Sequence, residues 1–205
     1  MKPQRLQTLQ EDGDAILVLD QTRLPYESVL VRLNSLESVA AAIRDMQVRG
    51  APLIGATAAY GVAIGIADDA TDARLDYVIR TLTATRPTAV NLLWALMRMD
   101  NALRQLVLVT RRQAAWTEAR KIAAEDVAAN CAIGTHGLAR LLALQKPARP
   151  IQIMTHCNAG RLATVAHGTA LAPVYAAHAA GIPIHVWGVR NQAAQSRLTH
   201  RLGAC

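Results

Sequence analysis

The amino-acid sequence predicts an α/β protein: an N-terminal β-hairpin plus a helical bundle, followed by the start of a Rossmann-like parallel sheet. Three features of the sequence carry this prediction. Residues 14–33 alternate apolar and polar side chains, as half-buried strands do. Residues 34–144 contain successive stretches in which apolar side chains recur with helical spacing. The short apolar runs Ile151–Met154 and Ile184–Trp187 lie on either side of an Ala- and Leu-rich stretch, which is typical of a strand–helix–strand unit with parallel strands.

The hairpin comes first along the chain. It is expected to pair Ala15–Leu19 with Tyr26–Leu33 through a turn at residues 20–23. Polar residues at 34–37 then offer a helix start, and residues 38–48 continue with helical period. The chain is therefore expected to pass directly from the second strand into its helical part.

Four further helices are predicted before residue 146. Glycine and proline at residues 50–52 end the first helix, because neither is favoured inside one. Arg86-Pro87-Thr88 opens a later helix, with the proline near the first turn, where its missing N–H costs little. The four helices are predicted over residues 53–67, 74–84, 86–108 and 110–144, the last interrupted near Gly134 or Gly137.

A domain boundary is predicted at the proline-containing segment Lys146–Pro150. Residues 1–146 then form an N-terminal, mainly helical domain. Residues 150–187 form the first strand–loop–helix–strand unit of a Rossmann-like second domain, in which Gly181 closes the helix. Such units bind ligands at the carboxyl ends of their strands, so the loop after Met154 is expected to carry a functional site.

Composition limits the possible partners. The chain has 205 residues, 52% of them hydrophobic, and a net charge of +7. Lysine occurs only at Lys2, Lys121 and Lys146, and the arginines are scattered without a dense basic run or interleaved aromatic residues. The positive charge therefore does not indicate a nucleic-acid partner, and we expect none.

The cysteines and the first residues indicate the compartment. Cys131, Cys157 and Cys205 give neither a disulfide framework nor a metal-ligand spacing, so we expect no metal and a reduced cytoplasm. The stretch at residues 1–14 is polar and lacks the apolar core of a secretory signal or a membrane anchor. A cytoplasmic protein without a membrane partner is expected.

Cys157 is the candidate nucleophile or acid–base group, because it follows the predicted strand and His156. At the head of a helix, exposed amides and the helix dipole would favour its thiolate and could also hold a phosphate. His156 would orient the thiol or have a structural role in the loop, and Asn158 and Gly160 would shape the turn. The residues alone leave a second interpretation open, a buried structural cysteine, since free cysteine is among the most buried residue types.

A second candidate site lies between two predicted helices, at Arg49, Gly50 and Ala51. The glycine permits a close backbone approach, the amides that follow can face an anion, and Arg49 supplies positive charge. Taken alone, such a loop is more often a simple helix break. Arg86 likewise reads either as a solvated arginine at a helix start or as a ligand contact.

Three ordered blocks give these residues a context. They are VRGAPLIGATAAYGVAIG at residues 48–65, RPTAVNLLWALMRM at residues 86–99, and THCNAG, followed by LAT, GTAL and IPIHVW, from residue 155. With an opening ILVLDQTRLP at residues 16–25, these blocks resemble the methylthioribose-1-phosphate isomerase family. The resemblance extends from about residue 14 to residue 187.

The resemblance implies an aldose–ketose isomerase that converts 5-methylthioribose 1-phosphate to 5-methylthioribulose 1-phosphate in methionine salvage. It implies that Cys157 is catalytic and that Arg49, Gly50, Ala51 and Arg86 contact the sugar phosphate. It also implies a homodimer of the full-length protein and no cofactor. Such a reaction needs a positioned acid and base, or a dry site that protects a migrating hydrogen.

Two alternatives stay open. A non-catalytic regulatory subunit, like the related α, β and δ subunits of eukaryotic initiation factor 2B, would share the fold, but it is not expected to keep the cysteine together with the arginines. Ribose-1,5-bisphosphate isomerisation is the nearest enzymatic alternative, because small substitutions in the pocket would decide the substrate.

After Trp187 the sequence departs from the family's pattern. The family continues with V-D-E-T-R-P, then Q-G and L-T-A-W-E-L, and a later G-A-D-R segment carries a catalytic aspartate. Residues 188–205 here read GVRNQAAQSRLTHRLGAC, and one permitted codon string for residues 190–205, read one nucleotide later, gives ETRPRNQGSLTAWEL. We therefore expect a shifted frame near Gly188, an out-of-frame tail at residues 188–205, and little or no activity from this truncated chain.

Overall fold

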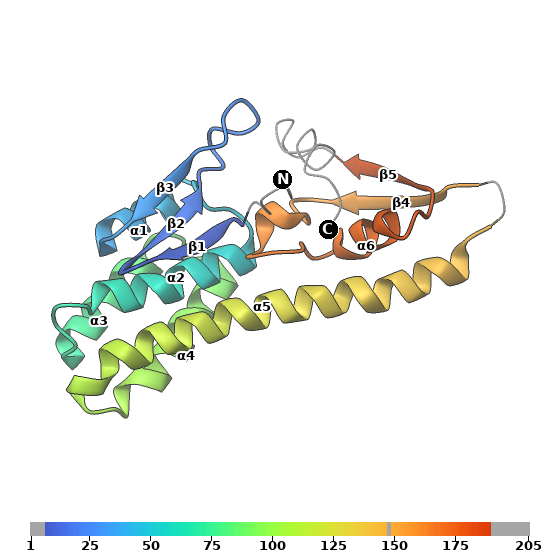
Figure 1. The fold of residues 1–205 in the computed structure, drawn as a ribbon. Coiled ribbons are helices and arrows are strands. Elements are labelled where there is room, and N and C mark those ends of the chain that lie inside the picture. Colours follow the sequence, from blue (N-terminus) through green and yellow to red (C-terminus); the bar gives the residue numbers. More distant parts are fainter. Residues whose placement is uncertain (1–6, 147–148, 190–205) are drawn as a thin grey trace.

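The computed structural model describes residues 7–146 and 149–189 (Figure 1). An antiparallel sheet and a group of helices form one end of the molecule. A two-stranded parallel sheet forms the other end, and one long helix runs along both (Figure 1). This arrangement confirms the predicted α/β fold class. The expected tail lies outside the described residues from residue 190 onward, and the domain boundary at Lys146–Pro150 stays a prediction.

The first sheet has three strands in the order β1 (Leu9–Asp12), β2 (Ala15–Leu19), β3 (Leu30–Leu33). Strand β2 is central and largely buried, and it pairs with both neighbours in antiparallel register. The predicted hairpin is therefore present, but strand β1 was not predicted. Its sequence LQED has one apolar residue, so the strand shows no alternation that a sequence pattern could detect.

The second strand of the hairpin starts later than predicted, at Leu30 rather than Tyr26. The Asp20 N–H donates to the carbonyl oxygen of Val29 at 2.9 Å, and the turn then begins, because the Asp20 carboxylate accepts hydrogen bonds from the backbone N–H and the hydroxyl of Thr22. Tyr26 is 93% exposed, so it has no sheet face to cover. Asx-type bonding of this kind competes with the β-ladder and extends the turn.

Helix α2 (Ala51–Gly65) is the centre of the helical bundle, and its residues 53–65 are all buried. It packs against α1 (Leu36–Arg44), α3 (Asp72–Thr83), α4 (Val90–Arg104) and α5 (Leu108–Leu144). Small side chains permit this close packing. A Cβ at Gly61 or Gly65 would come within 3 Å of a valine side chain on a neighbouring helix.

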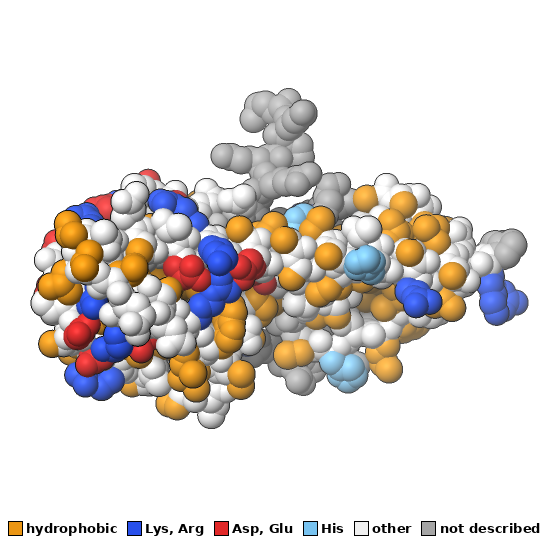
Figure 2. Space-filling view, turned by 90° about the horizontal axis from the view of Figure 1, so that it is seen from below, with side chains coloured by type: hydrophobic (Ala, Val, Ile, Leu, Met, Phe, Trp, Pro, Cys, Tyr) orange, Lys and Arg blue, Asp and Glu red, His pale blue; other side chains and the backbone are white. Residues whose placement is uncertain are grey.

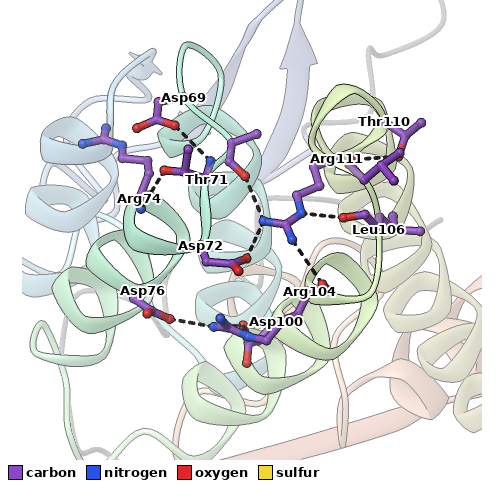
Figure 3. Close-up of polar contacts among 12 residues, drawn as sticks. Asp69, Thr71, Asp72, Arg74, Asp76, Asp100, Arg104, Leu106, Thr110 and Arg111 are labelled. Atoms are coloured by element: carbon purple, nitrogen blue, oxygen red, sulfur yellow. Dashed lines mark hydrogen bonds and ion pairs between the residues drawn. The ribbon is translucent and has the colours of Figure 1, made fainter.

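The predicted helix over residues 86–108 is shorter at both ends, because it begins at Val90 and ends at Arg104. The turn after it is held by Arg111 on α5, whose side chain is only 5% exposed. Its guanidinium donates hydrogen bonds to the carbonyl oxygens of Ala70, Arg104 and Leu106 and to the carboxylate of Asp72 (Figure 3). This single cation satisfies carbonyls that the end of α4 leaves open.

Helix α5 is continuous over 37 residues, so the predicted interruption near Gly134 or Gly137 is wrong. The two glycines are contact points instead. A Cβ at Gly137 would lie 2.2 Å from Cγ of Pro173, and one at Gly134 would lie 3.4 Å from the carbonyl oxygen of Ala172. Glycine at these positions lets the start of α6 (Ala172–Ala179) approach the long helix.

An 18-residue window of α5 is apolar and long enough to cross a membrane, and 11% of this window is buried in the described structure. On the face shown in Figure 2, hydrophobic side chains lie along the right-hand part of the molecule, and charged side chains of both signs are interspersed over the bundle at the left. The helix packs against α2, α4 and α6, so we interpret it as a core helix that the two ends of the molecule share.

The second sheet pairs β4 (Ile151–His156) with β5 (Ile184–Val189) in parallel, with Ile151 opposite Ile184. Both predicted strands are present. The helix expected between them is shorter than predicted, because residues 157–171 form a long loop with one 3₁₀ turn, η1 (Arg161–Ala163), before α6 begins. We call residues 157–171 the Cys157 loop.

Candidate active site

Cys157 is the first residue after β4, as the sequence predicts for a residue at the carboxyl end of a parallel strand. Its backbone has a positive φ of 62°, and its thiol is free and exposed. The alternative of a buried structural cysteine is therefore wrong. The expected place at the head of a helix is wrong as well, because the Cys157 loop delays the next α-helix until Ala172.

The loop at Arg49, Gly50 and Ala51 lies directly against the Cys157 loop. Gly50 has a φ of +95°, and a Cβ on it would come 2.3 Å from the Cα of Ala163. Such a distance leaves room for glycine only. The structure thus brings together two sequence blocks that are more than a hundred residues apart, as the assignment of both to one site requires.

Ala51 is the first residue of α2, and Pro52 stands in the first turn. The first backbone amides of this helix therefore lie next to the contact of Gly50 with Ala163. Within the part of the chain that the structure describes, no side chain caps this helix start. The amide groups of an uncapped helix N-terminus favour an anion.

Arg49 and Arg86 are both half-buried. Among the described residues, neither guanidinium takes part in a hydrogen bond or an ion pair. Arg86 lies in the turn that precedes α4, and the start of α4 packs on α2, where a Cβ at Gly55 would come 2.9 Å from the carbonyl oxygen of Asn91. The turn of Arg86 therefore adjoins the first turns of α2, although the structure gives no direct contact between Arg86 and the Cys157 loop.

Asn158, next to Cys157, has a buried side-chain nitrogen that finds no hydrogen-bond acceptor within residues 7–146 and 149–189. Buried donors of this kind are rare and costly, and they often mark a position where a ligand binds. Asn158 can therefore donate a hydrogen bond to an oxygen of a bound molecule.

Three polar side chains from the N-terminal part of the chain hold the Cys157 loop. The Thr8 hydroxyl lies 2.6 Å from the carbonyl oxygen of Thr164, and the Gln21 side-chain nitrogen lies 2.7 Å from that of Leu162. The carboxylate of Asp126 on α5 accepts the Val165 N–H at 2.8 Å. Thr8 and Gln21 are 2% and 4% exposed. These contacts are internal hydrogen bonds in a dry region, where they define position more strictly than surface contacts do.

Burial of its carboxyl group raises the pKa of Asp126, and the hydrogen bonds from the Val165 N–H and the Asn130 amide only partly oppose this shift. The carboxylate also accepts from the Asn130 side chain at 2.8 Å. Asp126 is thus a half-buried acid, one of whose oxygens holds the Cys157 loop while the other accepts from Asn130 on the same helix.

Sequence reasoning missed Thr8, Gln21 and Asp126. Gln21 stands in the segment that was interpreted as a turn, and Thr8 precedes a strand that alternation did not reveal. Asp126 is one of several acidic residues on a long helix, and nothing in the local sequence separates it from solvated ones. The only signal in the sequence is that these polar residues stand near apolar ones. This signal is weak, because the sequence does not show which polar side chains are buried.

Comparison with known proteins gives this geometry a family context. A family model described as the initiation factor 2 subunit family matches residues 47–193. The chain is 58% identical over 186 residues to a methylthioribose-1-phosphate isomerase of Dechloromonas aromatica, covering 90% of this chain and 51% of that protein. It is also 58% identical over 183 residues to the protein of the same name from Rhodospirillum rubrum, covering 86% and 47%.

Two solved structures share the fold. The δ subunit of translation initiation factor eIF-2B from A. fulgidus matches with a TM-score of 0.80 and 32% identity, over 97% of this chain and 61% of that one. The 5-methylthioribose 1-phosphate isomerase from Pyrococcus horikoshii matches with a TM-score of 0.76 and 35% identity, over 88% and 51%. The chain spans about half the length of the curated relatives it matches.

Proposed function

Because this chain belongs to the initiation factor 2 subunit family, we propose that it carries the first part of an aldose–ketose isomerase that converts 5-methylthioribose 1-phosphate to 5-methylthioribulose 1-phosphate. We expect ligand binding but little or no turnover from this chain, because its sequence departs from the family's pattern after Trp187. The observation that carries the proposal is the contact of Gly50 with Ala163. It brings the loop of Arg49 against the Cys157 loop, which supports the proposal that Arg49, the amides at the start of α2 and the thiol of Cys157 act on one small ligand. The named isomerases among the relatives supply the substrate class.

The proposed roles follow from the chemistry of the groups. Arg49, the amides of Gly50 and Ala51 and the guanidinium of Arg86 bind the phosphate, because unpaired guanidinium groups and helix-start amides are the natural partners of a phosphate dianion. The reaction opens the sugar ring and moves one hydrogen from carbon 2 to carbon 1. Cys157 is the candidate acid or base for a proton step.

The test uses two cysteines of one chain. Iodoacetamide alkylation is followed by peptide mass spectrometry for Cys157 and Cys131, both of which are exposed. Bound methylthioribose 1-phosphate is expected to slow alkylation of Cys157 roughly tenfold and to leave Cys131 on α5 unchanged, because a ligand shields the thiol it covers. Equal rates at Cys157 with and without saturating sugar phosphate would contradict the proposed site.

Ribose 1,5-bisphosphate is the comparison ligand, because it differs at the carbon that bears the methylthio group. We propose that methylthioribose 1-phosphate protects Cys157 at lower concentration. The reverse order of the two ligands would favour the bisphosphate isomerase.

A second candidate function is a non-catalytic regulatory subunit, which the likeness to the initiation factor δ subunit favours. The exposed thiol of Cys157 argues for the enzyme, as does Arg49, whose guanidinium finds no partner among residues 7–146 and 149–189, because a purely regulatory surface has no need of either. Protection of Cys157 by the sugar phosphate separates the two functions.

We also propose that the protein is cytoplasmic, needs no cofactor and forms a homodimer. Exposed apolar side chains support self-association: Val90 and Met97 of α4 are 78% and 57% exposed, and Leu93 and Trp94 between them are each 47% exposed. Such a stripe is unusual on a monomer. Sedimentation velocity is expected to give a dimer for the unsubstituted protein and a monomer for Val90→Asp/Met97→Asp, and a monomer for both would contradict the assignment.

A further inference from the structure

The two loops of the candidate site come from distant parts of the sequence, and contact of a glycine with an alanine sets their spacing but not their register. The Ala163 atoms nearest to a Cβ built on Gly50 are its Cα, its carbonyl oxygen and its methyl group. Van der Waals contact is not directional, so the two loops could slide past each other. Some directional contact must therefore fix the loops relative to each other.

Gln21 makes such a contact with both loops. Its backbone N–H donates a hydrogen bond to the carbonyl oxygen of Gln47 at 2.9 Å, two residues before Arg49. Its side-chain nitrogen donates to the carbonyl oxygen of Leu162 at 2.7 Å, one residue before Ala163. We propose that Gln21 is a positioning residue that holds the loop of Arg49 and the Cys157 loop in register.

The position of Leu162 is passed on to Cys157 by bonds within the Cys157 loop. The carbonyl oxygen of Ala159 accepts the N–H groups of Thr169 and Leu171 at 3.0 and 3.2 Å, and the N–H of Ala163 donates to the carbonyl oxygen of Gly160. Residues 159–163 therefore move as one piece with the far end of the loop. A shift at Leu162 therefore displaces residues 159–163 and, with them, the adjoining Cys157 and Asn158.

Burial strengthens the effect of Gln21. The residue is 4% exposed and Leu162 is 3% exposed, so water has little access to replace a lost bond. A buried carbonyl oxygen that loses its donor is costly, and the loop moves to recover a partner. Because Gln21 itself lies outside the set of groups proposed to touch the sugar phosphate, its effect on the site is indirect.

The test compares Gln21→Met with Leu103→Val. Methionine has nearly the same length and keeps the backbone bond to Gln47, but it cannot donate to Leu162. Leu103 is fully buried in α4, so its substitution lowers stability without touching either loop. The two variants thus separate loss of register from a general loss of stability.

Two quantities are measured on the full chain. The first is amide hydrogen exchange of the peptide that covers the Cys157 loop. In Gln21→Met it is expected to become roughly tenfold faster than the variant's loss of global stability in urea unfolding explains, and in Leu103→Val to change by no more than that variant's own loss explains. The second is the concentration of methylthioribose 1-phosphate that protects Cys157 from iodoacetamide, which is expected to rise roughly tenfold in Gln21→Met only, since displaced binding groups lose affinity.

Unchanged exchange of the Cys157 loop in Gln21→Met overturns the inference, whatever the binding result. Faster exchange with unchanged protection by the sugar phosphate also overturns it, because the loops would then keep their binding geometry without Gln21. The inference rests on the proposed function, but the two fail separately. If the unsubstituted chain shows no protection at all, the proposed function fails, and hydrogen exchange alone decides whether Gln21 holds the loop.

Discussion

Gly50 combines a left-handed backbone with a contact that no side chain can enter, and these two demands can be separated by experiment. In Gly50→Ala, the alanine would have to adopt a φ of +95°, which is unfavourable for any residue with a Cβ. Its Cβ would also have to displace Ala163. We expect it to lower stability by about 2–4 kcal/mol and to abolish protection of Cys157 by the sugar phosphate.

Gly13 is the matched control for this substitution, because its φ is +67° and nothing lies within 4 Å of a Cβ built on it. Gly13→Ala is expected to cost about 1 kcal/mol in urea unfolding and to leave protection of Cys157 unchanged. Equal effects of the two substitutions on ligand protection would show that backbone conformation, and not the contact of the two loops, is what matters at Gly50.

Glu11 gives a prediction on pH. Burial by itself raises the pKa of Glu11, but hydrogen bonds from Arg120 and Tyr60 outweigh burial, and the net pKa is lowered. A carboxyl group with a lowered folded-state pKa stabilises the protein above its unfolded-state pKa, and this stabilisation is lost as the pH falls through the folded-state pKa.

Glu11→Gln is therefore expected to cost about 1 kcal/mol at pH 7, and the cost should vanish as the pH falls through the lowered folded-state pKa of Glu11. Urea unfolding of both proteins at several pH values measures it. Glu27→Gln serves as the control, because Glu27 pairs only with Arg23 and both side chains are more than half exposed. A cost for Glu11→Gln that does not change with pH would contradict the assigned partners.

Residue chemistry was predictable from the sequence where it depends on residue type, and not where it depends on a distant neighbour. The proposed roles of Cys157 at a strand end and of Gly50 between two helices follow from the residue type and its neighbours in the sequence. Gln21 does not, because its role depends on Leu162, and their separation in the chain is large. No short-range pattern encodes such a contact.

Among single elements, the long helix α5 best shows how packing overrides propensity. Glycine weakens an isolated helix by about 1 kcal/mol relative to alanine, which is why Gly134 and Gly137 predict a break. In the fold, the start of α6 occupies the space that a methyl group at Gly137 would need. The same packing keeps the helix whole, so the element could be predicted but its continuity could not.

The two glycines of α5 should respond differently to alanine. Gly137→Ala places a Cβ 2.2 Å from the ring of Pro173, which cannot rotate away, so we expect a loss of about 2 kcal/mol in thermal or urea unfolding. Gly134→Ala meets only an ordinary contact at 3.4 Å and should gain up to about 1 kcal/mol from helix propensity. A gain at both positions would mean that α6 does not pack where the structure places it.

Arg111 holds three elements together, at the start of α3, the end of α4 and the first turns of α5 (Figure 3). Lysine at this position keeps the charge but lacks the planar fork that reaches several acceptors at once. Arg111→Lys is expected to lower the free energy of unfolding by about 2 kcal/mol, because buried carbonyl oxygens lose their donors.

Arg112, the next residue, is exposed and provides the control. Arg112→Lys should change the free energy of unfolding by less than about 0.5 kcal/mol. A similar small effect for Arg111→Lys would show that water replaces the guanidinium at the turn between α4 and α5.

For the whole molecule, the fold class and the order of elements followed from the sequence because periodicity is a local property. The hairpin and the helical stretches appear near the residues where patterns of two and 3.6 residues predict them, and the two parallel strands appear where short apolar runs predict them. Strand β1 and the long Cys157 loop did not, since the first depends on pairing with β2 and the second on contacts from Thr8, Gln21 and Asp126.

Helix α5, at about 55 Å for its 37 residues, makes the two ends of the molecule thermodynamically dependent on each other. Its first half completes the core around α2, and its second half carries α6 and, through Asp126, the Cys157 loop. Unfolding either end removes the packing partners from one part of helix α5. Local opening at one end is therefore expected to spread to the other. We expect hydrogen exchange of α2 and of β4 to converge on one denaturant midpoint, as in a single cooperative unit. Separate midpoints would mean that helix α5 fixes the relative position of the two ends but does not couple their stabilities.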